Sequence, residues 1–198
     1  MRELGGPGVC VGLDEVGRGA LAGPLTVAAV ALPQQPRVEG LDDSKKLSPK
    51  RREQLASQVA EVALGIGIAH IAPEDIDAAG MAASLRVAFA RALRACEQDL
   101  AARGGPAHAD AVLLDGNPLH IREGEVSVVG GDGRVACIAA ASIVAKVTRD
   151  GLMRAYAEEL PGYGWEGNKG YGTAAHIAAI KELGPSNLHR RSFLGNIL

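Results

Sequence analysis

The sequence predicts an α/β fold in which a mixed sheet is flanked by helices. The first part of the chain is rich in short segments with strand patterning, and the later part in longer segments with helical periodicity. In chain order the segments read strand, strand, helix, strand, helix, strand, strand, helix, an alternation typical of helices packed against a sheet. With 198 residues, of which 47% are hydrophobic, the chain is long enough for one well-buried domain and short for two. We therefore expect a single domain over residues 1–198.

Five segments have the composition of strands. In the first, valine and leucine alternate with smaller or polar residues, which is the period-2 pattern of a strand. The second ends at Leu32-Pro-Gln-Gln-Pro36, where two prolines interrupt backbone pairing. The expected strands are residues 9–14, 25–32, 64–71, 111–114 and 126–129.

Start and stop signals bound four expected helices. Ser48 and Thr173 are capping residues directly before helical segments, and Pro49 occupies a first helical position. Glycine and proline end the second and the last of these segments, at Gly104-Gly-Pro106 and Gly184-Pro185. The expected helices run from Ser48 to about Glu61, over roughly 74–103, over 135–160, and from Thr173 to Gly184.

Composition argues against two classes of protein. No apolar run reaches membrane-spanning length and no charged-then-apolar leader opens the chain, which predicts a cytoplasmic protein with no membrane partner. The three cysteines are odd in number, far apart in the sequence and without paired zinc-ligand spacing. We expect buried, inert thiols rather than a disulfide framework or a zinc site.

The net charge of −2 at pH 7 argues at first against a nucleic-acid partner, but the distribution of charge matters more than the sum. Basic residues gather in two places, around the middle of the first half of the chain and near its end. The two groups are Lys45, Lys46, Lys50, Arg51 and Arg52, and Lys169, Lys181, Arg190 and Arg191. Two local basic patches on a nearly neutral protein are compatible with modest, salt-sensitive binding of a duplex.

Two adjacent carboxylates, Asp14 and Glu15, stand where the first expected strand ends, and a glycine-rich turn follows them. Adjacent carboxylates repel, so a site that uses both needs a cation to favour their ionised forms. Mg²⁺ and Mn²⁺ prefer carboxylate oxygen. A surface Asp-Glu pair in a turn is the simpler interpretation of those two letters alone. The apolar strand before them and the Gly-Arg-Gly sequence after them favour a metal site.

A third carboxylate, Asp115, follows the apolar run Val112-Leu-Leu114. In open α/β sheets, ligands bind at such carboxyl ends of strands, and Asp14 and Asp115 converge if their strands lie side by side. An Asp-Gly turn with no further role is the alternative for this dipeptide.

Six blocks in one order along the chain resemble the signatures of the ribonuclease HII family. They are Asp14-Glu-Val-Gly-Arg-Gly19, Asp43-Ser-Lys-Lys-Leu-Ser48, Leu114-Asp-Gly116, Ala139-Ala-Ala-Ser-Ile-Val-Ala-Lys-Val-Thr-Arg-Asp150, Lys169-Gly-Tyr-Gly-Thr173 and His189-Arg-Arg-Ser-Phe193. The resemblance implies a ribonuclease-H-like sheet with a small C-terminal helical extension from about residue 155. It also implies an endonuclease that cuts the RNA strand of RNA–DNA hybrids, and 5′ of single ribonucleotides embedded in duplex DNA.

The same resemblance implies two-metal hydrolysis, with Asp14, Glu15, Asp115 and Asp132 as metal ligands and catalytic residues. Four carboxylates can hold two Mg²⁺ or Mn²⁺ ions about 4 Å apart, one activating water and the other stabilising the departing 3′ oxygen. The implied products carry 3′-hydroxyl and 5′-phosphate ends.

The fourth ligand has two candidates, Asp132 and Asp150. The family usually has a lysine two residues before this acid, whereas the stretch here is Gly130-Gly-Asp-Gly133. That departure removes a basic side chain and puts a phosphate contact at this loop in doubt. We weight Asp132 over Asp150, because Asp150 lies deeper in a helix, where a salt bridge or a supporting role beside the site is expected.

Substrate choice needs a reader of the ribose 2′-hydroxyl, the group that distinguishes RNA from DNA. Gly17, Arg18 and Gly19 directly follow the carboxylate pair, so their backbone groups are candidates. The resemblance carries the family's junction tyrosine to Tyr171, although a tyrosine between two glycines is otherwise most often a loop anchor. It also suggests phosphate contacts for the two lysines of the second block, which position a duplex without reading its sequence. Those lysines are Lys45 and Lys46.

Three other functions fit parts of the pattern. A ribonuclease HIII-like hybrid nuclease shares the carboxylates, but that family normally has an extra N-terminal domain and lacks this Gly-Arg-Gly form. A non-catalytic hybrid-binding module would be marked by a lost carboxylate, and none of the first three is lost. A nucleotide switch is disfavoured because no Walker-type glycine loop occurs. A monomer is the default expectation.

Overall fold

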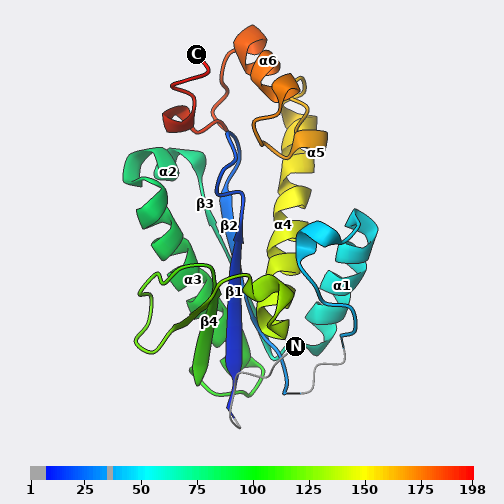
Figure 1. Cartoon of the computed structure of the whole chain (residues 1–198), viewed down its shortest axis with the longest axis vertical. Coiled ribbons are helices and arrows are strands. Elements are labelled where there is room, and N and C mark those ends of the chain that lie inside the picture. The colour runs from blue at the N-terminus through cyan, green and yellow to red at the C-terminus, as the bar shows by residue number, and fades with distance from the viewer. Residues whose placement is uncertain (1–7, 35–37) are drawn as a thin grey trace.

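The computed structural model describes residues 8–34 and 38–198, and it confirms the α/β prediction. A five-stranded sheet forms the centre, with its strands in the order β3-β2-β1-β4-β5. β1 pairs antiparallel with β2 and parallel with β4, so the sheet is mixed (Figure 1). The strands are β1 (Cys10–Val16), β2 (Leu25–Ala31), β3 (Gly65–Ile71), β4 (Ala111–Asp115) and β5 (Val126–Val128).

Helices cover both faces of this sheet. In Figure 1, α3 lies on one side of the strands, and α4 lies on the other side with α1 next to it. The α-helices are α1 (Pro49–Val62), α2 (Pro73–Ala79), α3 (Met81–Ala102), α4 (Ala136–Glu159), α5 (Trp165–Asn168) and α6 (Ala174–Leu183). The described residues also form three short 3-10 helices: η1 (Ser44–Lys46), η2 (Gly131–Gly133) and η3 (Arg191–Phe193).

The alternation of β1 divides the core between the two faces. Val11 and Leu13 are buried in the cluster that contains Phe89 of α3. Gly12 points to the other face, where a Cβ atom would lie 2.3 Å from the carbonyl carbon of Cys137 in α4. Successive residues of a strand face opposite sides, so Asp14 shares the α4 face with Gly12. The missing side chain at Gly12 therefore lets the start of α4 lie directly on the strand that carries Asp14.

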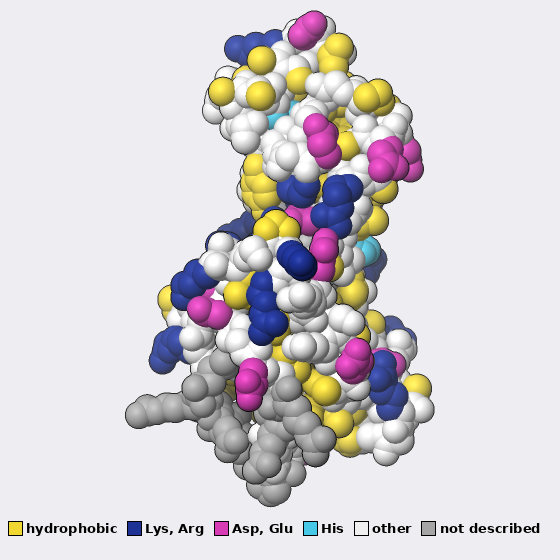
Figure 2. Space-filling model, turned by 90° about the vertical axis from the view of Figure 1, so that its right-hand side faces the viewer, with side chains coloured by type: hydrophobic (Ala, Val, Ile, Leu, Met, Phe, Trp, Pro, Cys, Tyr) yellow, Lys and Arg dark blue, Asp and Glu magenta, His cyan; other side chains and the backbone are white. Residues whose placement is uncertain are grey.

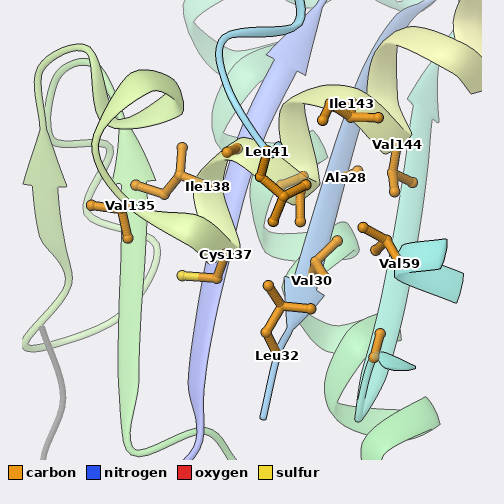
Figure 3. Packing of buried hydrophobic residues seen from close by; sticks show 14 of the residues in the cluster. Ala28, Val30, Leu32, Leu41, Val59, Val135, Cys137, Ile138, Ile143 and Val144 are labelled. Carbon is orange, nitrogen blue, oxygen red and sulfur yellow. The ribbon is translucent and has the colours of Figure 1, made fainter. Parts of the chain in front are cut away.

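A second cluster fixes α4 in this position. Val30 of β2, Val59 of α1 and Ile143 of α4 meet in one group of buried side chains (Figure 3). A fully buried side chain of this size stabilises the fold by about 1.5–3 kcal/mol relative to exposure. Apolar packing therefore fixes the position of α4, the helix that also carries the polar residues Ser142 and Arg149.

The structure corrects one of the expected helices. The helix expected over roughly 74–103 is two helices, because Gly80 has a φ of 78° and caps both α2 and α3. The helix expected over 135–160 is observed as α4, and η2, which contains Asp132, precedes it. The short α5 was not expected; its caps Gly164 and Lys169 both have left-handed backbone conformations.

The thiols are free, as expected, but they are not all buried and apart. Cys10 is half-buried and its Sγ lies 3.8 Å from the Sγ of Cys137, whereas Cys96 is buried in the core on the opposite face of the sheet.

None of the helices in the described part of the chain combines the length and the apolar character that crossing a bilayer requires.

Candidate metal centre and nucleic-acid interface

Three carboxylates from three elements converge at one end of the sheet. Asp14 lies near the end of β1, Asp115 ends β4, and Asp132 lies in η2. β1 and β4 are parallel neighbours with Leu13 opposite Leu114, so the two aspartates that follow are also neighbours. Carboxylate oxygens of the three aspartates lie within 4.8 Å of one another.

Backbone groups orient these carboxylates. The N–H of Glu15 donates to Asp14 Oδ1 at 2.7 Å, and the N–H of Gly131 donates to Asp115 Oδ1 at 2.7 Å. The second bond ties the end of β4 to the loop that holds Asp132. A Cβ atom at Gly131 would lie 2.6 Å from Cδ1 of Ile138, so that side chain would have to shift to accept one. The glycine-rich loop that departs from the family pattern therefore still brings its carboxylate to the group.

The electrostatics of this group favour the uptake of cations. Burial, which is the largest cause, acts together with the negative charges of Glu15 and Asp115 and against a lowering hydrogen bond from Ser142, and the net effect raises the pKa of Asp14 to about 7. Burial likewise raises the pKa of Asp132, with the charge of Asp115 adding to the effect. Buried carboxylates that repel one another are stabilised by a bound cation, and an all-oxygen set suits Mg²⁺ or Mn²⁺.

Glu15 lies beside this group but is not one of the three converging residues. Its side chain forms an ion pair with Arg18, at 3.6 Å between Oε1 and Nη1. Burial raises the pKa of Glu15, the Arg18 charge lowers it, and the Asp115 charge raises it. Glu15 is thus close enough to Asp115 for their charges to interact, although its carboxylate faces Arg18 in this structure.

Only one of the two candidates for the fourth carboxylate reaches the group. Asp132 is a member of it, whereas Asp150 is not. Asp150 is as buried as Asp14, at 7% exposure, but its Oδ1 accepts a hydrogen bond from Lys146 Nζ at 2.8 Å. In this structure Asp150 therefore forms an ion pair with Lys146, which lies one turn earlier in α4.

Two segments that are far apart in the sequence meet beside the carboxylates. The N–H of Gly17 donates to the hydroxyl of Tyr171 at 3.2 Å, and the N–H of Leu21 donates to the carbonyl of Gly170 at 2.8 Å. Gly17 has a φ of 85°, a conformation that favours glycine. Arg18 and Gly19 are exposed next to this contact. The structure thus places Gly17–Gly19 and Tyr171 together.

The lysines of η1 lie near η2, which carries Asp132. Lys45 and Lys46 are exposed, and Lys46 Nζ is 3.1 Å from Asp42 Oδ1. The charge of Lys45 lowers the pKa of Asp132, so this loop lies near η2. A basic charge is therefore present beside the Gly130–Gly133 loop, although it comes from another segment than the family pattern suggests.

Ser142 is a site residue to which the sequence analysis assigned no role. Its hydroxyl forms a hydrogen bond with Asp14, and its Oγ lies 2.9 Å from Oγ of Ser44 in η1. Both serines are buried. A single polar residue inside the apolar run 139–145 is the sequence signal that marks it.

The second predicted basic patch requires a correction. Arg190 is completely buried, so it is not a surface cation. Trp165, which the sequence left unassigned, is also buried; its Nε1 donates to Nε2 of His176 at 3.0 Å. On the face shown in Figure 2, Lys and Arg side chains are interspersed with Asp and Glu, in keeping with the near-neutral net charge.

A family model described as ribonuclease HII matches residues 11–195. A ribonuclease HII of Jannaschia sp. (strain CCS1) is 48% identical over 195 residues, which cover 97% of this chain and 92% of the relative.

Solved structures agree in fold. The ribonuclease H2 from Pyrococcus horikoshii OT3 superposes with a TM-score of 0.76 at 22% identity, covering 96% of each chain. Bst-RNase HIII in complex with Mn²⁺ gives a TM-score of 0.68 at 20% identity over 93% of this chain and 66% of that one. Both likenesses confirm the predicted ribonuclease-H-like architecture.

Proposed function

Because this chain belongs to the ribonuclease HII family, and is thus a ribonuclease H of type 2, we propose that it cuts the RNA strand of RNA–DNA hybrids and cuts 5′ of single ribonucleotides embedded in duplex DNA. The observation that carries the proposal is the convergence of Asp14, Asp115 and Asp132 within 4.8 Å. Such a set of oxygen donors, two of them buried and one half-buried, suits phosphodiester hydrolysis assisted by divalent cations.

Asp14, Asp115 and Asp132 would hold Mg²⁺ or Mn²⁺, with Glu15 turning from Arg18 to complete the set. When bound, two such ions supply an activated water and stabilisation of the leaving 3′ oxygen, which gives 3′-hydroxyl and 5′-phosphate ends. The oxygen-only donor set supports this choice of ion, and Bst-RNase HIII, a fold relative, was solved with Mn²⁺.

The protein's own contribution at this site is orientation. The N–H groups of Glu15 and Gly131 each occupy one oxygen of an aspartate, Oδ1 of Asp14 and Oδ1 of Asp115, and so fix how the two carboxylates are turned. The hydroxyl of Ser142 adds a further bond to Asp14. Carboxylates fixed in this way need not reorganise when the charge develops in the transition state.

Recognition of the ribonucleotide is assigned to Gly17–Gly19 and Tyr171. Backbone groups of this turn and the tyrosine hydroxyl would contact the 2′-hydroxyl beside the scissile phosphate. The bond between the Gly17 N–H and the Tyr171 hydroxyl, at 3.2 Å, supports their acting as one unit. Lys45 and Lys46, which are exposed near η2, would contact phosphates and position the duplex.

The test is a panel of three matched duplexes: all-DNA, one embedded ribonucleotide, and a full RNA–DNA hybrid. We expect cutting of the second and third, only with Mg²⁺ or Mn²⁺, and at the 5′ side of the single ribonucleotide. Asp115→Asn should leave all three uncut, and Asp110→Asn serves as the matched control because Asp110 instead accepts a bond from the Val9 N–H. Cutting of the all-DNA duplex at an equal rate, or full activity in EDTA, would contradict the proposal.

A further inference from the structure

Two arginines are completely buried beneath the segment that joins β1 to β2. Arg149 lies in α4 and Arg190 precedes η3, and both have 0% exposure. Burying a cation is unfavourable unless it is paired. Among the described residues no carboxylate oxygen lies within 4.0 Å of either guanidinium, and Asp150 and Asp77 interact with them only over a longer distance.

The guanidinium donors are satisfied by backbone carbonyls instead. Arg149 donates from Nε to Pro24 O at 2.8 Å, from Nη2 to Ala22 O at 2.9 Å, and from Nη1 to Lys169 O at 2.8 Å.

Arg190 donates to Gly23 O from Nε at 3.1 Å and from Nη2 at 2.9 Å, and from Nη1 to Arg18 O at 3.0 Å. Four carbonyls of the segment 18–24 are thereby turned toward two buried cations.

Backbone hydrogen bonds hold the stretch around Arg190 against the segment 18–24. The N–H of Arg190 donates to Leu21 O at 2.8 Å, and the N–H of Gly23 donates to Leu188 O at 2.8 Å. The next residues are anchored on α2, because Asp77 accepts bonds from the N–H groups of Arg191 and Ser192 at 2.7 and 3.0 Å. The tail is therefore fixed on both sides of Arg190.

The hydrogen bond from Arg190 Nη1 to the Arg18 carbonyl lies in the turn Gly17–Gly19, which is proposed to contact the ribose. In a trans peptide the carbonyl of one residue and the N–H of the next point in opposite directions. When Arg190 holds the carbonyl of Arg18 inward, the N–H of Gly19 must point outward. Gly19 is exposed, and within the described residues its N–H has no protein acceptor. The result is an outward-facing donor in the turn that follows Asp14 and Glu15.

Arg149 supports the other half of the same turn. A Cβ atom at Gly17 would lie 2.2 Å from Arg149 Nε, so the turn rests directly on this side chain. The guanidinium carbon also lies 5.6 Å from the centre of the Tyr171 ring. Both parts of the proposed reader, the turn and the tyrosine, thus touch one buried cation.

We infer that Arg190, with Arg149 beside it, is a positioning residue for ribonucleotide recognition: by holding the Arg18 carbonyl inward it presents the Gly19 N–H to an oxygen of the ribose or of the adjacent phosphate. This inference rests on the proposed function. The two positive charges beneath the turn, without a paired carboxylate, strengthen such a donor toward an anionic backbone.

The main test is Arg190→Lys, which keeps the charge but replaces the planar fork with a single ammonium group that cannot reach both carbonyls in the same geometry. We expect kcat/KM on the one-ribonucleotide duplex to fall roughly 10- to 100-fold, the loss typical of one misplaced hydrogen bond to a charged group. Mn²⁺ binding and affinity for all-DNA duplex should stay within about twofold. Arg122→Lys is the matched control, since Arg122 pairs with Glu97 away from this turn.

A second measurement covers the case in which Arg190→Lys does not fold. Replacing Gly19 by glycolic acid converts its amide to an ester, which removes the N–H and leaves the rest of the turn in place. This protein should show the same selective loss. Retained cutting of the one-ribonucleotide duplex by the ester protein, or by a folded Arg190→Lys variant, overturns the inference. Failure of the wild type to cut any ribonucleotide substrate would instead overturn the proposed function.

Discussion

Asp14→Asn should stabilise the metal-free protein while it removes activity. Burial and two neighbouring negative charges raise the pKa of Asp14 to about 7 from its ordinary value of 3.8. Between these values the folded protein holds a proton that the unfolded chain releases, so the free energy of unfolding falls as the pH rises. Below pH 3.8 both states are protonated and the effect vanishes. Above about pH 7 it is complete.

The size of the effect follows from the pKa difference. A rise from 3.8 to about 7 is roughly 3 pH units, which at about 1.4 kcal/mol per unit amounts to an upper bound of about 4 kcal/mol. For a chain of this length, 1 kcal/mol shifts the melting temperature by about 2–4 °C. In EDTA at pH 8, Asp14→Asn should therefore melt up to roughly 8–16 °C above the wild type.

Asp150→Asn is the matched control, because Asp150 has the same 7% exposure but pairs with Lys146 at 2.8 Å. Removing its charge leaves the half-buried ammonium of Lys146 without its partner, so this variant should melt below the wild type. The assay is thermal unfolding followed by circular dichroism from pH 4 to 8, with and without Mn²⁺. Our reasoning is refuted if Asp14→Asn melts no higher than the wild type at pH 8, or if its advantage does not shrink toward pH 4.

Three further outcomes are expected from variants at the site. Asp132→Asn should lower the initial rate of cleavage of one duplex at saturating metal at least 100-fold more than Asp150→Asn does. If Asp150→Asn is instead the less active variant and also loses Mn²⁺ binding, Asp150 and not Asp132 is the fourth ligand. Tyr171→Ala should lower kcat/KM on a single embedded ribonucleotide about 10-fold or more, with smaller effects on all-DNA affinity; an equal loss on long hybrids would leave Tyr171 a loop anchor. Lys45→Ala and Lys46→Ala should weaken binding to all duplexes alike, and each should reduce the slope of log affinity against log salt by about 1. An unchanged slope would show that these lysines do not contact phosphates.

Much of the fold follows from local patterns in the sequence. The segments ending in Asp14 and Asp115 were expected to be apolar strands with carboxylates at their ends, and parallel pairing of β1 with β4 brings those ends together. Capping chemistry placed the starts of α1 and α6, where Ser48 and Thr173 accept the expected backbone bonds. Strand alternation and capping depend on neighbours within a few residues, which is why sequence alone predicts them.

Other features depend on contacts that no local pattern encodes. Gly80 lies within a helical periodicity, and only its positive φ in the folded chain divides α2 from α3. Arg190 has the appearance of a surface cation in a basic cluster, yet its donors are used by the carbonyls of Arg18 and Gly23, more than 160 residues away. The pairing of Ser142 with Ser44 spans 98 residues. Long-range hydrogen bonds of this kind come from the tertiary structure.

The most direct test of the central claim, that these aspartates form a divalent-metal site, is an anomalous difference map from crystals of this protein soaked in Mn²⁺. The proposal predicts manganese peaks between Asp14, Asp115 and Asp132, with oxygen ligands at about 2.0–2.3 Å and Glu15 turned from Arg18 toward the ions. Manganese bound elsewhere, with no density among these three carboxylates at concentrations that support cleavage, would contradict it.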